Sequence, residues 1–197
     1  MEYRLTKAEL VNTLRGWSKF SKRKVRLIAC GGTALTLLDI KASTKDIDLM
    51  VPDPKEYHYL TKVLRDIGYK QLNPARWKKE NEFFEIDLYS GKKIHTTELL
   101  ESPLEEGNHI FLQNIGQFYI GVLNFYDLIS SKLFRGTSVD FEDCLMLARV
   151  KEKEINKDLL IKRYNELASY DIAEDRIKGH IQSFIDRWGK EVNENGR

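Results

Sequence analysis

The sequence predicts an α+β fold in which a mixed β-sheet flanked by helices is followed by a C-terminal helical bundle. Up to about residue 122, apolar runs of strand length alternate with segments whose apolar residues recur at helical spacing. From residue 123 onward, four helical patterns follow one another with short breaks. No repeat or low-complexity linker separates the two parts, so we expect a core at 1–122 with a helical region at 123–197 packed on it.

Each element is placed from its apolar pattern and from the residues at its ends. A helix is predicted from about Thr6 to Phe20, because Thr6 and Glu9 form a capping-box pattern ahead of apolar residues at helical spacing. Another is expected to end at Gly68, a residue suited to a helix C-terminus. The segments with helical patterns are 6–20, 33–40, 55–68, 124–134, 138–150, 157–169 and 171–188. The segments with strand patterns are 25–30, 46–51, 75–80, 82–91 and 109–123, the last holding one strand or two.

Composition bounds the class of protein. With 197 residues, 42% of them hydrophobic, the chain buries a core of its own. Charged residues run through the first twenty positions and no apolar run approaches the roughly 20 residues that span a bilayer, so we expect a cytoplasmic protein with no membrane partner. Cys30 and Cys144 lie in apolar surroundings and are expected to be reduced core residues. The four histidines show no zinc-ligand spacing.

The charge is unevenly distributed along the chain. The net charge is only +2, but residues 1–100 hold 19 Lys and Arg against 13 Asp and Glu. Basic clusters occur at 21–26 and 75–79. Such clusters either meet the phosphates of a nucleic acid or are solvated lysines that flank strands, and both interpretations stay open.

Two aspartates one residue apart interrupt the apolar run that ends at Val51. Successive side chains of a strand alternate between faces, so Asp46 and Asp48 point the same way, with roughly 7 Å of backbone between them. Two carboxylates aimed at one place repel each other unless a cation lies between them. Oxygen ligands without His or Cys suit Mg²⁺ or Mn²⁺. A metal site for phosphoryl chemistry is one interpretation, and exposed residues at a strand end are the other.

A third aspartate and a glycine pair favour the metal site. Asp87 lies between two apolar residues of a predicted strand, and if that strand neighbours the first one, the three aspartates converge on a site for two metal ions. Gly31 and Gly32 join a buried strand to a helix, where backbone N–H groups stabilise an anionic phosphate, and Thr33 adds a hydroxyl. By themselves, the glycines are better explained by a tight turn.

Taken together, these residues resemble the nucleotidyltransferase superfamily of the DNA polymerase β type. The shared pattern is Gly31-Gly32, thirteen intervening residues, the D-x-D of Asp46 and Asp48, and a later strand carboxylate, Asp87. More narrowly, "GGTALTLL" followed by "STKDIDL" is similar to the AbiEii/MenT-type nucleotidyltransferases, a group that contains toxins of toxin–antitoxin systems. The resemblance covers 25–87 and implies a nucleotidyltransferase fold for the sheet region.

The resemblance also implies the roles of individual residues. It assigns Asp46, Asp48 and Asp87 as catalytic metal ligands for Mg²⁺ or Mn²⁺. It assigns the binding of a nucleoside triphosphate to a set of residues in both parts of the chain, namely Gly31, Gly32, Thr33, Lys45, Lys132 and Asp143.

The C-terminal half adds weaker support. In the family, a lysine on a helix after the core and a later D-x-x-D belong to the active-site region, and Lys132, Asp140 and Asp143 match them. Lys132 would then assist catalysis as the phosphate leaves. The alternative is that Lys132 is a surface lysine of an amphipathic helix and has no catalytic role. The chain departs from the family in having Val139 where a basic residue is common, and Lys41 where an arginine is common. These departures concern the choice of substrate more than the fold.

The resemblance therefore implies an enzyme that transfers a nucleoside monophosphate from a triphosphate to an acceptor hydroxyl. The expected acceptor is an RNA end such as that of tRNA, with Arg76, Trp77 and Lys78 among the phosphate and stacking contacts, or else a protein side chain. A toxin role, with an antitoxin protein as partner, follows from the resemblance alone. The alternatives are a catalytically silent module that binds RNA or protein, a nucleotidyltransferase of small molecules such as antibiotics, and an unrelated metal-dependent phosphohydrolase.

Overall fold

The computed structural model describes residues 3–195, with side chains for 3–190. The chain forms two compact units. The first comprises Met1–Ile94 and Glu101–Asn124, and the second comprises His95–Leu100 and Phe125–Arg197. The division after Asn124 falls close to the boundary expected at 122, whereas the assignment of His95–Leu100 to the second unit has no counterpart in the sequence pattern.

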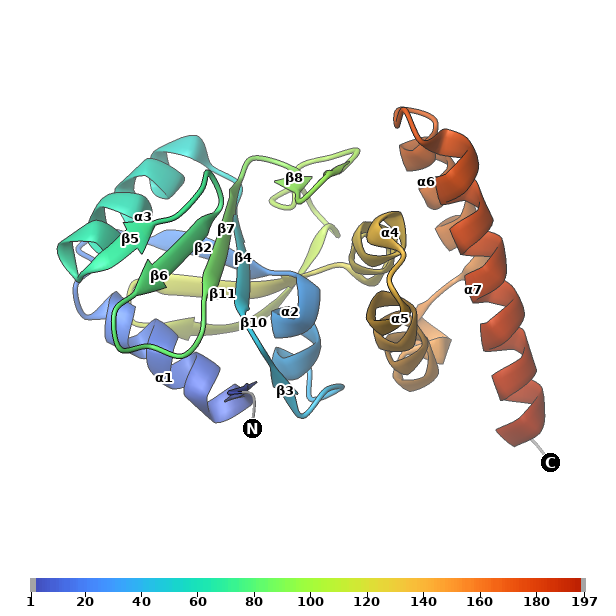
Figure 1. The fold of residues 1–197 in the computed structure, drawn as a ribbon, viewed down its shortest axis with the longest axis horizontal. Helices are drawn as coiled ribbons and strands as arrows, with labels where there is room; N and C mark the ends of the chain where they lie inside the picture. The colour runs from blue at the N-terminus through green and yellow to red at the C-terminus, as the bar shows by residue number, and fades with distance from the viewer. Residues whose placement is uncertain (1–2, 196–197) are drawn as a thin grey trace. The chain divides into compact units, whose positions relative to one another are not determined.

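A mixed seven-stranded sheet forms the centre of the first unit, in the order β10-β11-β2-β4-β7-β6-β5 (Figure 1). The pairs β11–β2 and β4–β7 are parallel and the other pairs are antiparallel. The strands of this sheet are β2 (Val25–Ala29), β4 (Ile47–Val51), β5 (Tyr69–Gln71), β6 (Arg76–Lys79), β7 (Ile86–Ser90), β10 (His109–Ile115) and β11 (Phe118–Leu123). The short strands elsewhere are β1 (Leu5–Thr6), which pairs with β3 (Ser43–Thr44), and β8 (Lys93–Ile94) and β9 (Thr97–Glu98). The predicted mixed sheet with flanking helices is confirmed.

Three helices flank this sheet, and their ends follow the capping chemistry of the sequence. They are α1 (Lys7–Ser18), α2 (Gly31–Leu37) and α3 (Pro54–Asp66). The capping box at α1 is confirmed: Thr6 Oγ1 accepts from the Glu9 N–H, and the Glu9 carboxylate accepts from the Thr6 N–H at 2.7 Å. The Asp53 side chain caps α3, and Gly68, with φ +96°, follows its C-terminus.

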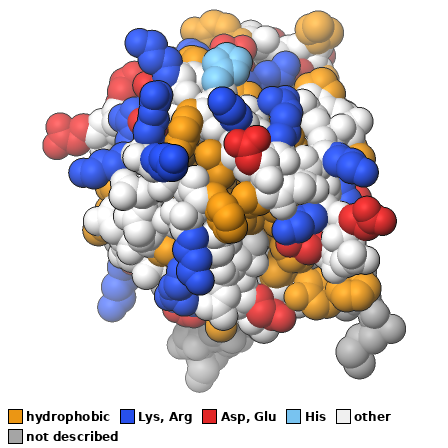
Figure 2. Space-filling view, turned by 90° about the vertical axis from the view of Figure 1, so that its left-hand side faces the viewer, with side chains coloured by type: hydrophobic (Ala, Val, Ile, Leu, Met, Phe, Trp, Pro, Cys, Tyr) orange, Lys and Arg blue, Asp and Glu red, His pale blue; other side chains and the backbone are white. Residues whose placement is uncertain are grey.

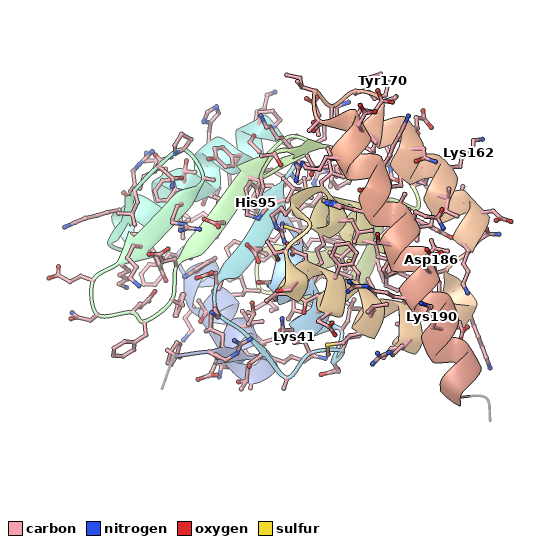
Figure 3. The ribbon with its side chains drawn as sticks, turned by 45° about the vertical axis from the view of Figure 1, so that its right-hand side comes forward. Lys41, His95, Lys162, Tyr170, Asp186 and Lys190 are labelled. Carbon is pink, nitrogen blue, oxygen red and sulfur yellow. The ribbon has the colours of Figure 1, made fainter. Side chains whose placement is uncertain are left out.

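Four helices and a 3₁₀ turn make up most of the second unit. They are α4 (Phe125–Arg135), α5 (Ser138–Val150), η1 (Glu152–Glu154), α6 (Lys157–Ala168) and α7 (Glu174–Asn195). In α7 the buried residues Ile177, Ile181, Phe184 and Trp188 recur at the helical spacing of a core-facing stripe. Tyr170, on the turn between α6 and α7, is 78% exposed, and Asp186 and Lys190 extend from α7 (Figure 3). The four predicted helical segments are confirmed.

Both cysteines are buried, as predicted for core residues, and within residues 3–195 neither forms a disulfide. Among residues 3–195, no helix is long and apolar enough to cross a membrane.

Candidate active site

Asp48 and Asp87 are direct neighbours on one face of the sheet. Strands β4 and β7 run parallel with Asp48 opposite Asp87, and the flanking pair Ile47 and Ile86 points to the other, buried face. Asp87 is 5% exposed. The condition that the two strands are neighbours is therefore met, and their pairing places two of the three carboxylates side by side.

Asp46 joins these carboxylates from just outside the strand. The sequence pattern placed Asp46 on the strand, but β4 begins at Ile47, so this prediction was wrong by one residue. The backbone N–H of Glu85 hydrogen-bonds to the Asp46 carboxylate. Burial and then the negative charge of Asp87 raise the pKa of Asp46, although the nearby Arg76 cation opposes the shift. Burial and the neighbouring Asp87 carboxylate thus both disfavour the charged form of Asp46.

The glycine turn lies against the Asp48 carboxylate. Gly31 has φ +55°, a conformation that favours glycine, and a Cβ at this position would come within 2.8 Å of Asp48 Cγ. A Cβ on Gly32 would lie 2.5 Å from Thr44 Oγ1. The first reason for the glycine pair is therefore the close approach of Asp48 and Thr44, which the sequence pattern did not reveal.

Thr33 ties the turn to the aspartate segment. Its hydroxyl donates to the carbonyl of Asp46 at 3.1 Å and accepts from the N–H of Asp48 at 2.9 Å, and its side chain is almost fully buried. The Cys30 N–H donates to the carbonyl of Asp48 at 3.1 Å. The structure thus shows Thr33 holding the two aspartates in place. Lys45, on the bend that precedes β4, is exposed.

A substitution at Gly31 tests this packing. Gly31→Ala is expected to destabilise the protein by about 2–4 kcal/mol, because an alanine is strained at positive φ and its Cβ collides with Asp48. Urea denaturation of both proteins measures this change. Gly91→Ala is the matched control, since Gly91 also has positive φ (+68°) but its Cβ would meet nothing within 4 Å. Equal losses for the two variants would show that the contact with Asp48 contributes nothing.

Arg76 is the residue of this site that the sequence pattern assigned elsewhere. Its Nε and Nη2 donate to the two oxygens of Asp87 at 2.9 and 3.0 Å, and its Nη1 lies 3.2 Å from Glu85 Oε2. These bonds raise the pKa of Arg76 further above its ordinary value. The antiparallel register of β6 and β7 places Arg76 opposite Asp87, and no pattern in a single strand reveals that pairing.

The expected stacking contact of Trp77 is wrong. Trp77 is fully buried on the opposite face of β6 from Arg76, and the Arg65 guanidinium of α3 lies 5.1 Å from the centroid of its ring. A buried indole beneath α3 is not accessible to a nucleobase.

The donor chemistry of the site fits a hard divalent cation. Asp46, Asp48 and Asp87 supply only carboxylate oxygens, and their crowded charge is what such a cation stabilises. Within 3–195, no three carboxylate, thiolate or imidazole side chains are already arranged around a common point as metal ligands. At Asp87, both carboxylate oxygens already accept hydrogen bonds from Arg76.

Removal of the Asp46 charge is expected to stabilise the metal-free protein. Because Asp46 is charged beside Asp87 and partly buried, Asp46→Asn should raise the free energy of unfolding at neutral pH by up to about 1 kcal/mol after solvent screening. Thermal and urea unfolding in the presence of a chelator measure it. A less stable variant would mean that the bond from Glu85 outweighs the repulsion.

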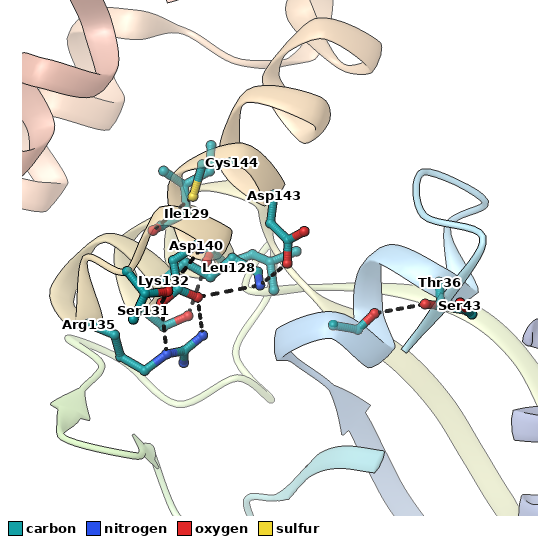
Figure 4. A network of polar contacts seen from close by, with 12 residues as sticks. Thr36, Ser43, Leu128, Ile129, Ser131, Lys132, Arg135, Asp140, Asp143 and Cys144 are labelled. Carbon is teal, nitrogen blue, oxygen red and sulfur yellow. Dashed lines mark hydrogen bonds and ion pairs between the residues drawn. The ribbon is translucent and has the colours of Figure 1, made fainter. Parts of the chain in front are cut away.

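The second unit contains a buried network of four charged side chains (Figure 4). Lys132 is 2% exposed, and its Nζ donates to Asp143 Oδ2 at 2.7 Å and lies 3.9 Å from Asp140 Oδ1. Arg135 and the Thr137 hydroxyl both donate to Asp140. Burial raises the pKa of Asp140, but the bond from Arg135 and its charge outweigh burial, so the net pKa is lowered. The structure thus brings Lys132, Asp140 and Asp143 together within the second unit.

Comparisons with known proteins bear on the fold. No protein family model and no curated protein matches the sequence. Among solved structures, an antigenic nucleotidyltransferase-like protein from Paracoccidioides brasiliensis aligns with a TM-score of 0.50 at 14% identity, over 75% of this chain and 79% of that chain. A putative nucleotidyltransferase from Thermotoga maritima aligns with a TM-score of 0.46 at 15% identity, over 82% and 98% of the two chains. One from H. pylori aligns with a TM-score of 0.46 at 13% identity, over 92% and 95%. The chain has a nucleotidyltransferase-like fold.

Proposed function

We propose that the protein is a metal-dependent nucleotidyltransferase that transfers a nucleoside monophosphate from a nucleoside triphosphate to an acceptor hydroxyl. The observation that carries this proposal is the placement of the Asp48 carboxylate between the Gly31 turn and Asp87, within a unit of nucleotidyltransferase-like fold. The site combines three carboxylates that suit a divalent cation with a glycine turn at the start of a helix. Phosphoryl transfer requires both a cation and a group that orients the phosphates.

Each residue of the first unit has a distinct task in this proposal. Asp46 and Asp48 hold a cation together with the triphosphate, and Asp87 is the third ligand. When bound, Mg²⁺ or Mn²⁺ neutralises phosphate charge and polarises the acceptor hydroxyl. The turn at Gly31 and Gly32 orients the triphosphate for in-line attack, in which the acceptor oxygen bonds to the α-phosphorus as the bond to pyrophosphate breaks.

The remaining residues of the predicted set keep supporting roles. Thr33 positions Asp46 and Asp48 through its hydroxyl, and the exposed Lys45 is proposed to meet the nucleotide's phosphates. Lys132 and Asp143 are retained as candidates for nucleotide binding on the strength of the motif match.

RNA, such as a tRNA end, is the proposed acceptor, with a protein hydroxyl as the alternative. Figure 2 shows Lys and Arg side chains around apolar side chains on the face that it presents. In the first unit, Phe20 is 61% exposed and directly precedes the basic cluster at 21–26, whose Lys22, Arg23 and Lys24 are exposed. An exposed aromatic ring beside lysines suits a single strand, because bases stack and phosphates pair. Phe20 therefore replaces Trp77 as the candidate stacking residue.

Transfer of label from the nucleotide tests the proposed reaction. The purified protein is incubated with each α-labelled nucleoside triphosphate, Mg²⁺ and total tRNA or protein. We expect label on the acceptor and release of pyrophosphate, both lost when a chelator removes the metal. Release of inorganic phosphate without any acceptor would instead identify a phosphohydrolase. Label on a small aminoglycoside but on no macromolecule would identify an antibiotic-modifying enzyme.

A catalytically silent module is the second candidate, and the pairing of Asp87 with Arg76 favours it. In a silent protein this ion pair would permanently neutralise the third carboxylate. Calorimetry separates the two candidates, since only the enzyme is expected to bind a triphosphate in a Mg²⁺-dependent manner.

A toxin role, with an antitoxin as partner, is proposed from the motif resemblance. We expect overexpression of the chain to arrest growth and Asp46→Ala to relieve the arrest. Unchanged growth with both proteins would remove the toxin role and leave the enzymatic proposal intact.

A further inference from the structure

The guanidinium of Arg76 covers the innermost carboxylate of the site. The Asp87 side chain is 7% exposed, whereas the side chains of Arg76 and Glu85 are 40% and 32% exposed. The Arg76 guanidinium thus contacts the buried Asp87 through Nε and Nη2, and the more exposed Glu85 through Nη1. It is the cation that balances the buried charge of Asp87 in the described structure.

The backbone fixes the position of Arg76 beside the site, while its long side chain is partly exposed. Arg76 lies opposite Asp87 in the β6–β7 register, so its Cα is fixed beside the site. Its side chain has several rotatable bonds and a partly exposed end. Glu85 Oε2 forms an ion pair with Nη1 at 3.2 Å, and Glu85 precedes Asp87 by two residues, so the guanidinium can leave Asp87 and still keep an ionic partner.

We propose that Arg76 is a resident counter-cation that competes with the divalent metal for Asp87. Asp46 and Asp48 accept a first cation while Arg76 remains on Asp87. Asp87 becomes a metal ligand only after the guanidinium turns to Glu85 and solvent. This inference rests on the proposed function, because it concerns the order in which the same carboxylates bind metal.

Electrostatics requires this competition. The two Asp87 oxygens already accept from a full positive charge at 2.9 and 3.0 Å. A divalent cation on the same carboxylate would stand within a few ångströms of that guanidinium and repel it, beside a carboxylate that is only 7% exposed. Arg76 therefore weakens metal binding at Asp87 by acting on the carboxylate that would hold the metal. It is a positioning residue.

Titration with Mn²⁺ alone, followed by electron paramagnetic resonance and calorimetry, tests the proposal. Arg76→Gln is expected to bind Mn²⁺ about tenfold more tightly than the unaltered protein, or to bind one ion more, because two charge-assisted hydrogen bonds no longer occupy Asp87. Arg26→Gln is a close control. The Arg26 side chain is also 40% exposed, and its Nε and Nη2 donate to Glu56 Oε1 at 2.9 and 2.6 Å. This pair has similar geometry, but its carboxylate is not one of the three aspartates of the site.

The outcomes separate this inference from the proposed function. Equal Mn²⁺ affinity and stoichiometry for Arg76→Gln and the unaltered protein would overturn the role of Arg76 and leave the enzyme proposal standing. No Mn²⁺ binding by any of the proteins at millimolar metal would overturn both. Arg76→Lys guards against a folding artefact, because it keeps the charge but loses the bidentate geometry. Its affinity is expected between those of the unaltered protein and Arg76→Gln, with circular dichroism confirming the fold, and an affinity as high as that of Arg76→Gln would contradict the competition.

Discussion

Replacement of Asp48 by asparagine is expected to reduce nucleotidyl transfer on the order of 10³-fold or more. Asp48 is the aspartate that lies beside Asp87, Gly31 and Thr33. It lies opposite Asp87 across the β4–β7 pair, its side chain fills the space beside Gly31, and its backbone N–H is bound by Thr33. Asparagine keeps the shape of the side chain and removes the charge that binds a divalent cation. The rate of label transfer from an α-labelled triphosphate measures the loss.

Two measurements show whether Asp48→Asn loses activity because the metal-binding charge is missing or because the fold is damaged. Asp66→Asn is the matched control, because Asp66 is an exposed aspartate of the same unit, in the last residue of α3. It should transfer label at the unaltered rate. Asp48→Asn should also lose Mn²⁺ binding while its thermal unfolding stays cooperative. Full activity of Asp48→Asn would remove the carboxylates from the mechanism.

Replacement of Lys132 by methionine is expected to destabilise the protein by about 3–5 kcal/mol. Lys132 is 2% exposed and donates to Asp143, whose side chain is only 5% exposed. Without the ammonium group, a buried carboxylate loses the cation that donates to it, and this is among the costliest losses in a protein interior. Urea denaturation, with the slope of the transition compared between proteins, measures the change.

A double-mutant cycle with Asp143 identifies the source of that loss. If the ion pair is responsible, Lys132→Met combined with Asp143→Leu should recover at least half of the stability, because no charge then stays buried alone in this pair. Lys178→Met is the control, since Lys178 forms an exposed pair with Glu174 and should change stability little. A loss below about 1 kcal/mol for Lys132→Met would mean that solvent reaches the network.

Much of the candidate site follows from local patterns. The D-x-D, the glycine pair and the isolated Asp87 each interrupt an apolar run where a charge or a turn is unexpected, and their spacing matches a known motif. A strand alternates its faces, so Asp87 was expected to point away from its buried neighbours, and the structure agrees. Helix ends were equally predictable, because Thr6 with Glu9 acts through contacts three residues apart.

Pairings between distant segments were not predictable in this way. Nothing local distinguishes Arg76 from the two lysines of its cluster; only the register of β6 against β7 places it on Asp87. The same alternation turns Trp77 to the opposite face, beneath Arg65 of α3. The contact of Asp48 with Gly31 likewise joins two segments separated by a helix. These contacts depend on strand order, which local propensity does not specify.

The amino-acid sequence by itself determined the α+β class, most of the helices and strands, and the identity of three carboxylates and two glycines as an unusual set. Each of these is recognised from a short segment of the chain or from the spacing of such segments, so no pairing in space has to be known. Only the tertiary structure decided which side chains share the sheet face that carries Asp48 and Asp87. It therefore also decided that Arg76 donates to the third carboxylate, Asp87. Charge neutralisation acts over a few ångströms in space, and only the packed sheet brings residues 48, 76 and 87 within that range.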